Sequence, residues 1–278
     1  DIAFLISCSL FVSGVATVLQ TLGVPYLGAQ LPLVQGISFA SVSTLTAIVA
    51  GHGQEGLRTA YGAIIVSGLI AFLIVPFFAS IVRFFPPVVT GSIITVIGLS
   101  LLPVAGKWIT GQPLIFGKGA PVPNPDFGDT GNIGLAMFTL LVVLILSKLK
   151  MFARMAILLS LVIGTVAALI LGLTKFSFTG QHILALPQPF KFGMPIFAIG
   201  AIVSMLIVML VIMVETTADI LAVGEVVGTE VPAKRVANGL RADMLSSMVA
   251  PIFNTFPATA FAQNVGLVAL TRIKSRYV

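Results

Sequence analysis

Charged residues are scarce in this chain: Asp, Glu, Lys and Arg make up 9% of its 278 residues, whereas hydrophobic residues make up 58%. A soluble domain carries about 25% charged residues, which cover its water-facing surface. The mean hydropathy of +1.12 also indicates a chain that is mostly apolar. These values exclude a water-soluble globular domain and predict a polytopic membrane protein embedded in a lipid bilayer.

Residues for metal or catalytic chemistry are also few. The single cysteine, Cys8, lies in an apolar segment, which excludes an internal disulfide framework and a Cys-rich metal site. His52 and His182 have no second ligand at metal spacing, so no metal site is predicted. The sequence holds no phosphate-binding loop, dinucleotide fingerprint or Ser-His-Asp motif. The chain is therefore not expected to be an enzyme.

The net charge of +6 arises from small Lys/Arg clusters between apolar runs. The positive-inside rule expects such clusters in the cytoplasmic loops of a membrane protein. A nucleic-acid-binding domain would instead gather its basic residues in a stripe. We predict a multi-pass protein of the cytoplasmic membrane with no nucleic-acid partner.

Apolar runs long enough to cross a bilayer recur along the chain. A transmembrane helix needs about 20 predominantly apolar residues. With the stretch Gly28–Gly51 counted as one pass, the runs give about nine membrane segments. The other predicted helices are Ile2–Leu22, Thr59–Val82, Val88–Val104, Ile133–Ser147, Met155–Leu173, Ile196–Val223, Val236–Pro251 and a last segment around Asn264–Ile273.

Two apolar segments look broken rather than continuous. Gly28–Gly51 holds Pro32, Gly36 and a Ser/Thr-rich run, and Asn254–Gly266 holds Pro257 ahead of a helix start. Irregular backbone at membrane depth is tolerated only inside protein or beside a cavity. A pair of such segments is the sequence signature of a transporter binding site. The alternative is that Pro and Gly only kink two ordinary helices.

Carboxylates inside an apolar run are expensive and therefore suggest function. Glu215 and Asp219 stand four residues apart and share one face of a helix. Each must be paired, hydrogen-bonded or protonated at that depth, which suits a solute site or a proton carrier. The alternative is a structural polar contact between helices.

Three further polar residues lie before or within the second broken segment. Asp243 precedes a run without charge that lasts until Arg272, and the alternative is an interfacial acid paired with Arg241 or another cation. Gln263 and Asn264 lie at a helix start and offer amide donors and acceptors together. The amide pair suits the amide edge of a heterocycle.

The motifs resemble the nucleobase–ascorbate transporter family, also called nucleobase:cation symporter family 2, in its xanthine and uric acid permease branch. The family signature of Gln, Glu or Pro, then Asn-x-Gly, four residues and Thr reads here as Gln263–Thr271. The resemblance covers essentially the whole chain. Further matching segments are Gln35–Ala40, Phe85–Gly91, Glu215–Asp219, Ala222–Gly228, Gly239–Asp243 and Asn254–Pro257.

The resemblance implies an all-α fold of two inverted repeats of seven segments, divided into a core and a gate domain. The two broken segments would be half-helices that pair through short antiparallel strands. Residues 1–84 and 191–278 would hold core segments, and residues 85–190 would hold gate segments. Segments before Asp1 and after Val278 are implied as well, and so is a homodimer.

The resemblance also assigns roles to residues. The implied substrate-binding residues are Glu215, Gln263, the backbone of Ala262, Ala40, Ser41 and Asn264, and the implied coupling residues are Asp219 and Asp243. Many relatives carry an aromatic residue where Ser41 stands, which predicts a pocket of different shape here.

The function implied is import of an oxopurine, xanthine or uric acid, by an elevator-like movement of the core. Gln263 favours these bases, because uracil carriers of the family tend to have Glu there. No cofactor is expected beyond a coupling ion, a proton or else sodium. The alternatives are a uracil permease, an anion exchanger and a membrane fragment or subunit that does not transport.

Overall fold

The computed structural model describes residues 2–50, 52–81, 87–111, 114–115, 122–149, 152, 155–174 and 187–277. His182 and the predicted domain boundary between residues 84 and 85 lie outside these ranges. The chain forms two compact units, residues 1–95, 183–269 and 273–278 in the first, and residues 96–182 with 270–272 in the second. Their roles as core and gate stay predictions.

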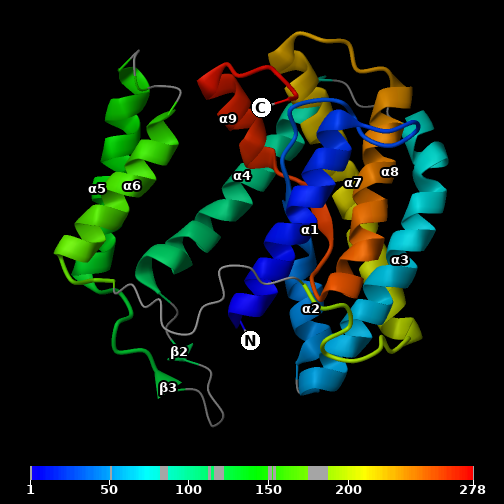
Figure 1. Ribbon diagram of the computed structural model, residues 1–278, viewed down its shortest axis with the longest axis horizontal. Helices are drawn as coiled ribbons and strands as arrows, with labels where there is room; N and C mark the ends of the chain where they lie inside the picture. Colours follow the sequence, from blue (N-terminus) through cyan, green and yellow to red (C-terminus); the bar gives the residue numbers. More distant parts are fainter. Residues whose placement is uncertain are drawn as a thin grey trace. The chain divides into compact units, whose positions relative to one another are not determined.

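The first unit contains most of the long helices. They are α1 (Ile2–Leu22), α2 (Val42–Val49), α3 (Gly53–Ile81), α7 (Ile199–Val227), α8 (Ala233–Val249) and most of α9 (Ala262–Thr271), with the short 3₁₀ helices η1 (Phe39–Ser41) and η4 (Ala250–Phe253). Helices α1, α3, α7 and α8 run side by side (Figure 1). Their shared interior is where the polar residues predicted from the sequence meet.

Small residues let α3 and α8 approach closely. A Cβ added at Gly68 would lie 3.2 Å from the backbone of Met248, so the two helices pack almost backbone to backbone there. Such contacts are typical of helices in membranes, where packing rather than hydrophobicity holds helices together. Larger side chains, among them Ile64, Met209 and Leu240, are fully buried and fill the rest of the core.

Two short strands join the broken segments. β1 (Gln35–Ile37) pairs antiparallel with β4 (Ala258–Ala260), in the register Gln35↔Ala260, Gly36↔Thr259 and Ile37↔Ala258. Backbone bonds extend the pairing beyond both strands, Ser38 N–H to Pro257 O at 2.8 Å and Phe261 N–H to Val34 O at 3.0 Å. The pairing satisfies backbone groups that a membrane interior leaves without water. The predicted half-helix segments with antiparallel strands are confirmed.

The second unit holds α5 (Thr130–Lys148), α6 (Ala156–Ile170), most of α4 (Pro87–Thr110), and the strand pair β2 (Leu114–Ile115) and β3 (Val122–Pro123). Asp129 caps α5 by accepting a hydrogen bond from Asn132 N–H at 3.1 Å. Helices α5 and α6 contact each other at Gly164, where a Cβ would lie 2.7 Å from Thr139 Oγ1.

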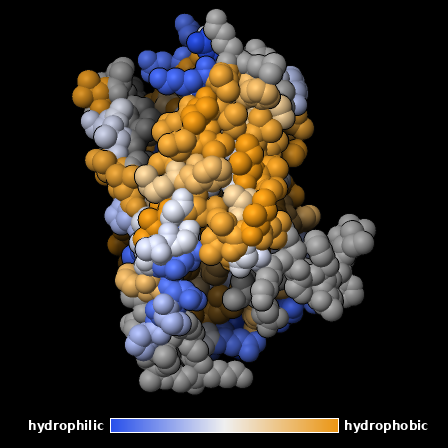
Figure 2. Space-filling model, turned by 90° about the vertical axis from the view of Figure 1, so that its left-hand side faces the viewer, coloured by the Kyte–Doolittle hydropathy of each residue, from blue (hydrophilic) through white to orange (hydrophobic). Residues whose placement is uncertain are grey.

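Large apolar side chains lie at the surface of the second unit. Figure 2 shows hydrophobic residues between hydrophilic ones at both ends, the pattern that a lipid bilayer imposes. No residue of α5 is buried, although Phe138, Leu141 and Leu144 are large and apolar. These side chains are stable at such positions only in contact with lipid or with another protein.

Four helices of the described residues are long and apolar enough to span a membrane: Phe4–Leu22, Gly53–Ser80, Thr130–Lys148 and Ile199–Val227. The prediction of a polytopic α-helical membrane protein is confirmed. Helix α1 has the predicted bounds, whereas α3 begins at Gly53 instead of Thr59. The difference arises because the polar first turns of α3 project beyond its apolar run.

Candidate functional site

The β1–β4 pair organises the candidate site, because the chain turns into a helix directly after each strand. η1 and α2 follow β1, and α9 follows β4. Helix α7 reaches the pair through Thr216, whose hydroxyl lies 3.2 Å from that of Thr259. Helix α8 reaches it through Ser247, which is bonded to Ala258. The site is therefore held by elements from distant parts of the sequence.

Glu215 and Asp219 lie one turn apart on α7 and differ in environment. Glu215 is half-buried. Asp219 is fully buried, and neither carboxylate oxygen has a hydrogen-bond partner within the described residues. A buried acid without partners is costly and points to a function rather than to structural support.

Asp243 is as buried as Asp219, but its carboxylate has partners. Oδ1 accepts a hydrogen bond from Gln20 Nε2 at 3.1 Å, and Oδ2 accepts one from the Thr216 hydroxyl. Arg241 does not pair with it, since its guanidinium donates to Asn238 Oδ1 at 2.9 Å. This contact gives no support to the alternative of an interfacial acid paired with Arg241 or another cation, and the role of Asp243 stays a prediction.

The first turn of α9 carries the amide pair. Gln263 is exposed, which leaves its amide available to a ligand. Asn264 is buried and donates from Nδ2 to Pro32 O at 2.6 Å, which fixes α9 to the segment before β1. Ala262, the first residue of the helix, is half-buried. Their roles toward a substrate stay predictions.

Ala40 and Ser41, which are predicted to bind substrate, lie in η1 directly after β1. Ala40 is half-buried, and Ser41 is buried with its hydroxyl donating to Ser38 O at 2.7 Å. The Ser41 hydroxyl is therefore engaged within its own turn. Any contribution of this turn to binding would come from its backbone or from its small size.

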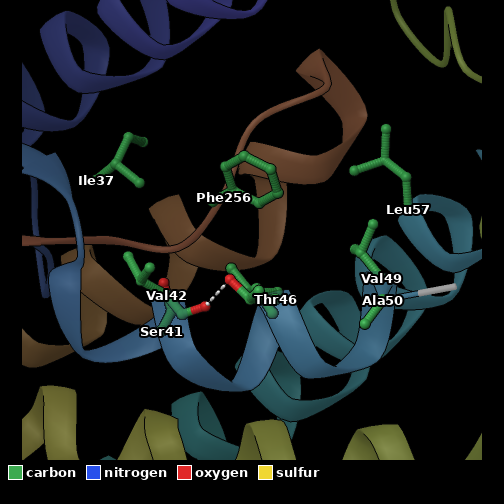
Figure 3. Close-up of a pocket in the computed structure, with 9 residues that line it drawn as sticks. Ile37, Ser41, Val42, Thr46, Val49, Ala50, Leu57 and Phe256 are labelled. Carbon is green, nitrogen blue, oxygen red and sulfur yellow. Dashed lines mark hydrogen bonds between the residues drawn. The ribbon is translucent and has the colours of Figure 1, made fainter. Parts of the chain in front are cut away.

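An apolar groove of about 420 Å³ opens on one side of α2 (Figure 3). Phe256 lies across the groove from Ser41 and Thr46, and the Thr46 hydroxyl donates to Val42 O at 2.7 Å. Since the Ser41 and Thr46 hydroxyls both donate to backbone carbonyls three or four residues earlier, the groove offers almost no polar contact. Its lining residues are Ile37, Ser41, Val42, Leu45, Thr46, Val49, Ala50, Leu57 and Phe256.

Three residues that the sequence did not single out shape the site. Gln20 and Thr216 hold Asp243, and Ser247 holds β4. Gln20 could have been found, because it is an amide in an otherwise apolar helix and such residues usually have a partner inside the membrane. Thr216 and Ser247 gave no signal, since hydroxyls usually bond within their own helix. The described residues include no cluster of three or more metal-ligating side chains.

Solved structures identify the fold. The transmembrane domain of a cyanobacterium bicarbonate transporter, BicA, superimposes with a TM-score of 0.59 at 12% sequence identity, over 99% of this chain and 75% of that one. At this identity the likeness shows the fold alone. The fold and its long apolar helices define an integral membrane protein with the fold of a transporter membrane domain.

The chain belongs to the permease family that its motifs resemble, the nucleobase–ascorbate transporters, because the family model matches residues 1–278. The uric acid permease PucJ and the xanthine permease of Bacillus subtilis are 40% and 39% identical to it, and the uric acid transporter UacT of Escherichia coli is 35% identical. Each comparison covers 100% of this chain, which spans 61%, 61% and 56% of these relatives. The family and its members are permeases, so the prediction that the chain is not an enzyme is confirmed.

Proposed function

We propose that this protein is a secondary active transporter of the cytoplasmic membrane that imports an oxopurine, xanthine or uric acid, together with a proton. The observation that carries the proposal is the placement of Glu215 and Gln263: a half-buried acid on α7, which contacts β4, and an exposed amide at the start of α9, which follows β4 in the chain. The relatives named above carry the same two kinds of substrate in their names.

The chemistry of the two side chains suits an oxopurine. The carboxylate of Glu215 accepts hydrogen bonds from ring N–H groups, and the amide of Gln263 matches an adjacent N–H and C=O edge. The N–H groups of Ala262 and Gln263, at the first two positions of α9, have no acceptor inside the helix and offer further donors. The N–H of Asn264 is bonded to Phe261 O at 2.9 Å. Uracil is the second candidate, since it presents a similar edge on a smaller ring.

Proton symport fits the buried carboxylates. A charge is costly to move through the membrane interior, so a proton on Glu215 or Asp243 makes movement of the site more favourable. In the elevator-like movement, the unit that carries the β1–β4 pair slides against the other. A homodimer is part of the same proposal.

An anion exchanger is supported less well. The bicarbonate transporter shares the fold, and two helix N-termini near a strand pair could bind an anion. Glu215 opposes this reading, because a carboxylate at the site repels an anion.

Uptake measurements test the proposal. Cells that express the full-length protein should accumulate radiolabelled xanthine, with competition by unlabelled uric acid and not by uracil. Glu215→Gln and Gln263→Ala should each abolish or greatly weaken uptake while the protein still reaches the membrane. Glu225→Gln, at an exposed position of the same helix, is the matched control and should transport normally. Normal uptake by either site variant would refute the site, and competition by uracil alone would refute the oxopurine.

The coupling ion needs its own measurement. Vesicles should accumulate xanthine when a proton gradient is imposed, and a protonophore should abolish the effect. Accumulation driven by a sodium gradient alone would refute proton symport and leave the substrate assignment intact.

A further inference from the structure

The amide of Gln20 has only one possible orientation. Its Oε1 accepts the Ala29 N–H at 3.0 Å, and its Nε2 lies 3.3 Å from Gly239 O and 3.1 Å from Asp243 Oδ1. A backbone N–H can only donate and a carbonyl can only accept, so the amide cannot flip. Gln20 therefore always donates to Asp243, and Oδ1 must always accept.

The Thr216 hydroxyl, on the other side of Asp243, has a choice. It donates to Asp243 Oδ2, and its oxygen lies 3.2 Å from the hydroxyl oxygen of Thr259 in β4. A hydroxyl has one donor and two acceptor positions and rotates to suit its neighbours. Thr216 can therefore donate to Asp243 and accept from Thr259, or do the reverse.

The backbone of Ala260 and the side chain of Gln35 also interact with the Asp243 carboxylate. Among its partners, Thr216 has a hydroxyl that can change its hydrogen-bond role when a proton binds. Oδ1 accepts from a fixed donor with one of its lone pairs, which makes it a weaker proton acceptor than an oxygen whose partner can turn. Oδ2 faces a hydroxyl that can turn. A proton on Oδ2 makes the Asp243 O–H donate to Thr216 Oγ1, and the Thr216 O–H then turns to donate to Thr259 Oγ1.

We infer that Gln20 and Thr216 are positioning residues for proton coupling: Gln20 holds Oδ1 of Asp243 as an acceptor and so favours a proton on Oδ2, and Thr216 relays the protonation state to Thr259 in β4. No bond other than Asp243 O–H forms, and the Thr216 proton stays on its own oxygen and only rotates. Since α9 and Gln263 follow β4 directly, the relay links the proton to the substrate site. The inference rests on the proposed proton symport.

Other titratable groups facing Asp243 come from α7. They are Glu215 and Asp219, whose charges act on that carboxylate. β4 and η4 carry none, and α1 contributes within its described side chains only Cys8, about three turns before Gln20. On α3, Glu55, Arg58 and the buried Tyr61 lie within the first three turns. Controls must therefore separate the relay from a general change in the charge of α7.

Three threonine variants make that separation. Thr216→Val removes the hydroxyl at nearly constant volume, and Thr216→Ser restores it. Thr217→Val is the matched control, because Thr217 is the next residue, is equally buried, and donates to Met213 O at 2.7 Å within its own helix. None of the three changes a charge.

The measurement is the ratio of proton-driven xanthine uptake to xanthine counterflow at equal pH, in vesicles that contain the full-length protein. In Thr216→Val the ratio should fall about fivefold, the factor that one ordinary hydrogen bond corresponds to. Counterflow should be retained, since the substrate contacts are untouched. Thr216→Ser and Thr217→Val should keep the normal ratio. A merely structural role would lower both activities together, and an unchanged ratio in Thr216→Val would overturn the inference.

Infrared spectroscopy tests the relay without transport. The pH-difference spectrum of the purified protein should contain a protonated carboxyl band that disappears in Asp243→Asn. Thr216→Val should shift this band, because the carboxyl loses its hydrogen-bond partner, and Thr217→Val should not. A band that stays in place refutes the relay even if Thr216→Val is inactive for another reason. If the band shifts but uptake ignores the proton gradient, the relay stands and the proposed proton symport fails.

Discussion

The ring of Phe261 lies directly on the backbone of Gly36. A Cβ added at Gly36 would lie 1.8 Å from Phe261 Cζ, far inside van der Waals contact. Phe261 stands between β4 and α9, so its ring closes over β1 from the opposite segment. The absence of a side chain at Gly36 therefore allows the two broken segments to pack at the centre of the site.

Gly36→Ala should consequently destabilise the protein, by about 1–3 kcal/mol as expected for overpacking. Phe261→Ala in the same chain should restore most of the loss, because the methyl group then occupies space left by the ring. Gly14→Ala is the control, since nothing lies within 4 Å of a Cβ at that position. The midpoint of thermal unfolding in detergent is measured for the unaltered protein, Gly36→Ala, the double variant and Gly14→Ala. If the double variant is no more stable than Gly36→Ala, this packing explanation is wrong.

Ser247 attaches β4 to α8 through both of its hydrogen-bonding functions. Its hydroxyl donates to Ala258 O at 2.9 Å, and accepts from Ala258 N–H at 3.1 Å. Ser247→Ala would leave buried backbone groups unpaired and should cost about 1–3 kcal/mol of unfolding free energy. Ser204→Ala, which removes a hydroxyl bonded only within α7, should leave the midpoint of thermal unfolding nearly unchanged. Equal effects of the two substitutions would contradict the role of Ser247.

Hydrophobic runs and helix breakers predicted much of this architecture. The bounds of α1 followed from its apolar run, and Pro32, Gly36 and Pro257 marked the two segments that pair as strands. These signals are local and can be read residue by residue. The pairing of the two segments with each other came from the family resemblance, because the strands lie more than two hundred residues apart in the chain.

The partners of the buried acids could not be predicted from the sequence. The spacing of Glu215 and Asp219 shows that they share a helix face, but not which of them is buried. Asp243 bonds Gln20, 223 positions away, whereas Asp219 has no partner within the described residues. Such differences depend on how helices are rotated against each other, and neither composition nor periodicity specifies that rotation.

Arg235 fixes the segment between α1 and β1. Its guanidinium donates to Ala29 O at 2.6 Å and to Gln30 O at 2.8 Å. Arg235→Ala should therefore loosen the segment and increase hydrogen exchange of the Gln30 amide about tenfold, since bonds from charged groups contribute about 1.5–3 kcal/mol. Arg235→Lys should rescue little, because one ammonium group cannot reproduce the planar fork.

The neighbouring residue provides the control for that measurement. Lys234 is exposed at the start of the same helix, and Lys234→Ala removes an equal charge. Hydrogen exchange of the Gln30 backbone N–H should stay as in the unaltered protein. If Lys234→Ala raises exchange as much as Arg235→Ala, the effect comes from charge and not from the two backbone contacts.

Asp219 and Asp243 should respond in opposite ways to the same isosteric change. Asp219→Asn removes a buried group that can ionise and has no partner, so the midpoint of thermal unfolding in mildly alkaline buffer should stay equal or rise. Asp243→Asn replaces an oxygen that accepts from Gln20 or Thr216 by an N–H₂ group, and should cost about 1–3 kcal/mol. Equal losses in both variants would show that Asp219 is hydrogen-bonded after all. Asp219→Asn is also expected to weaken proton-driven uptake, so its retained stability would separate a functional acid from a structural one.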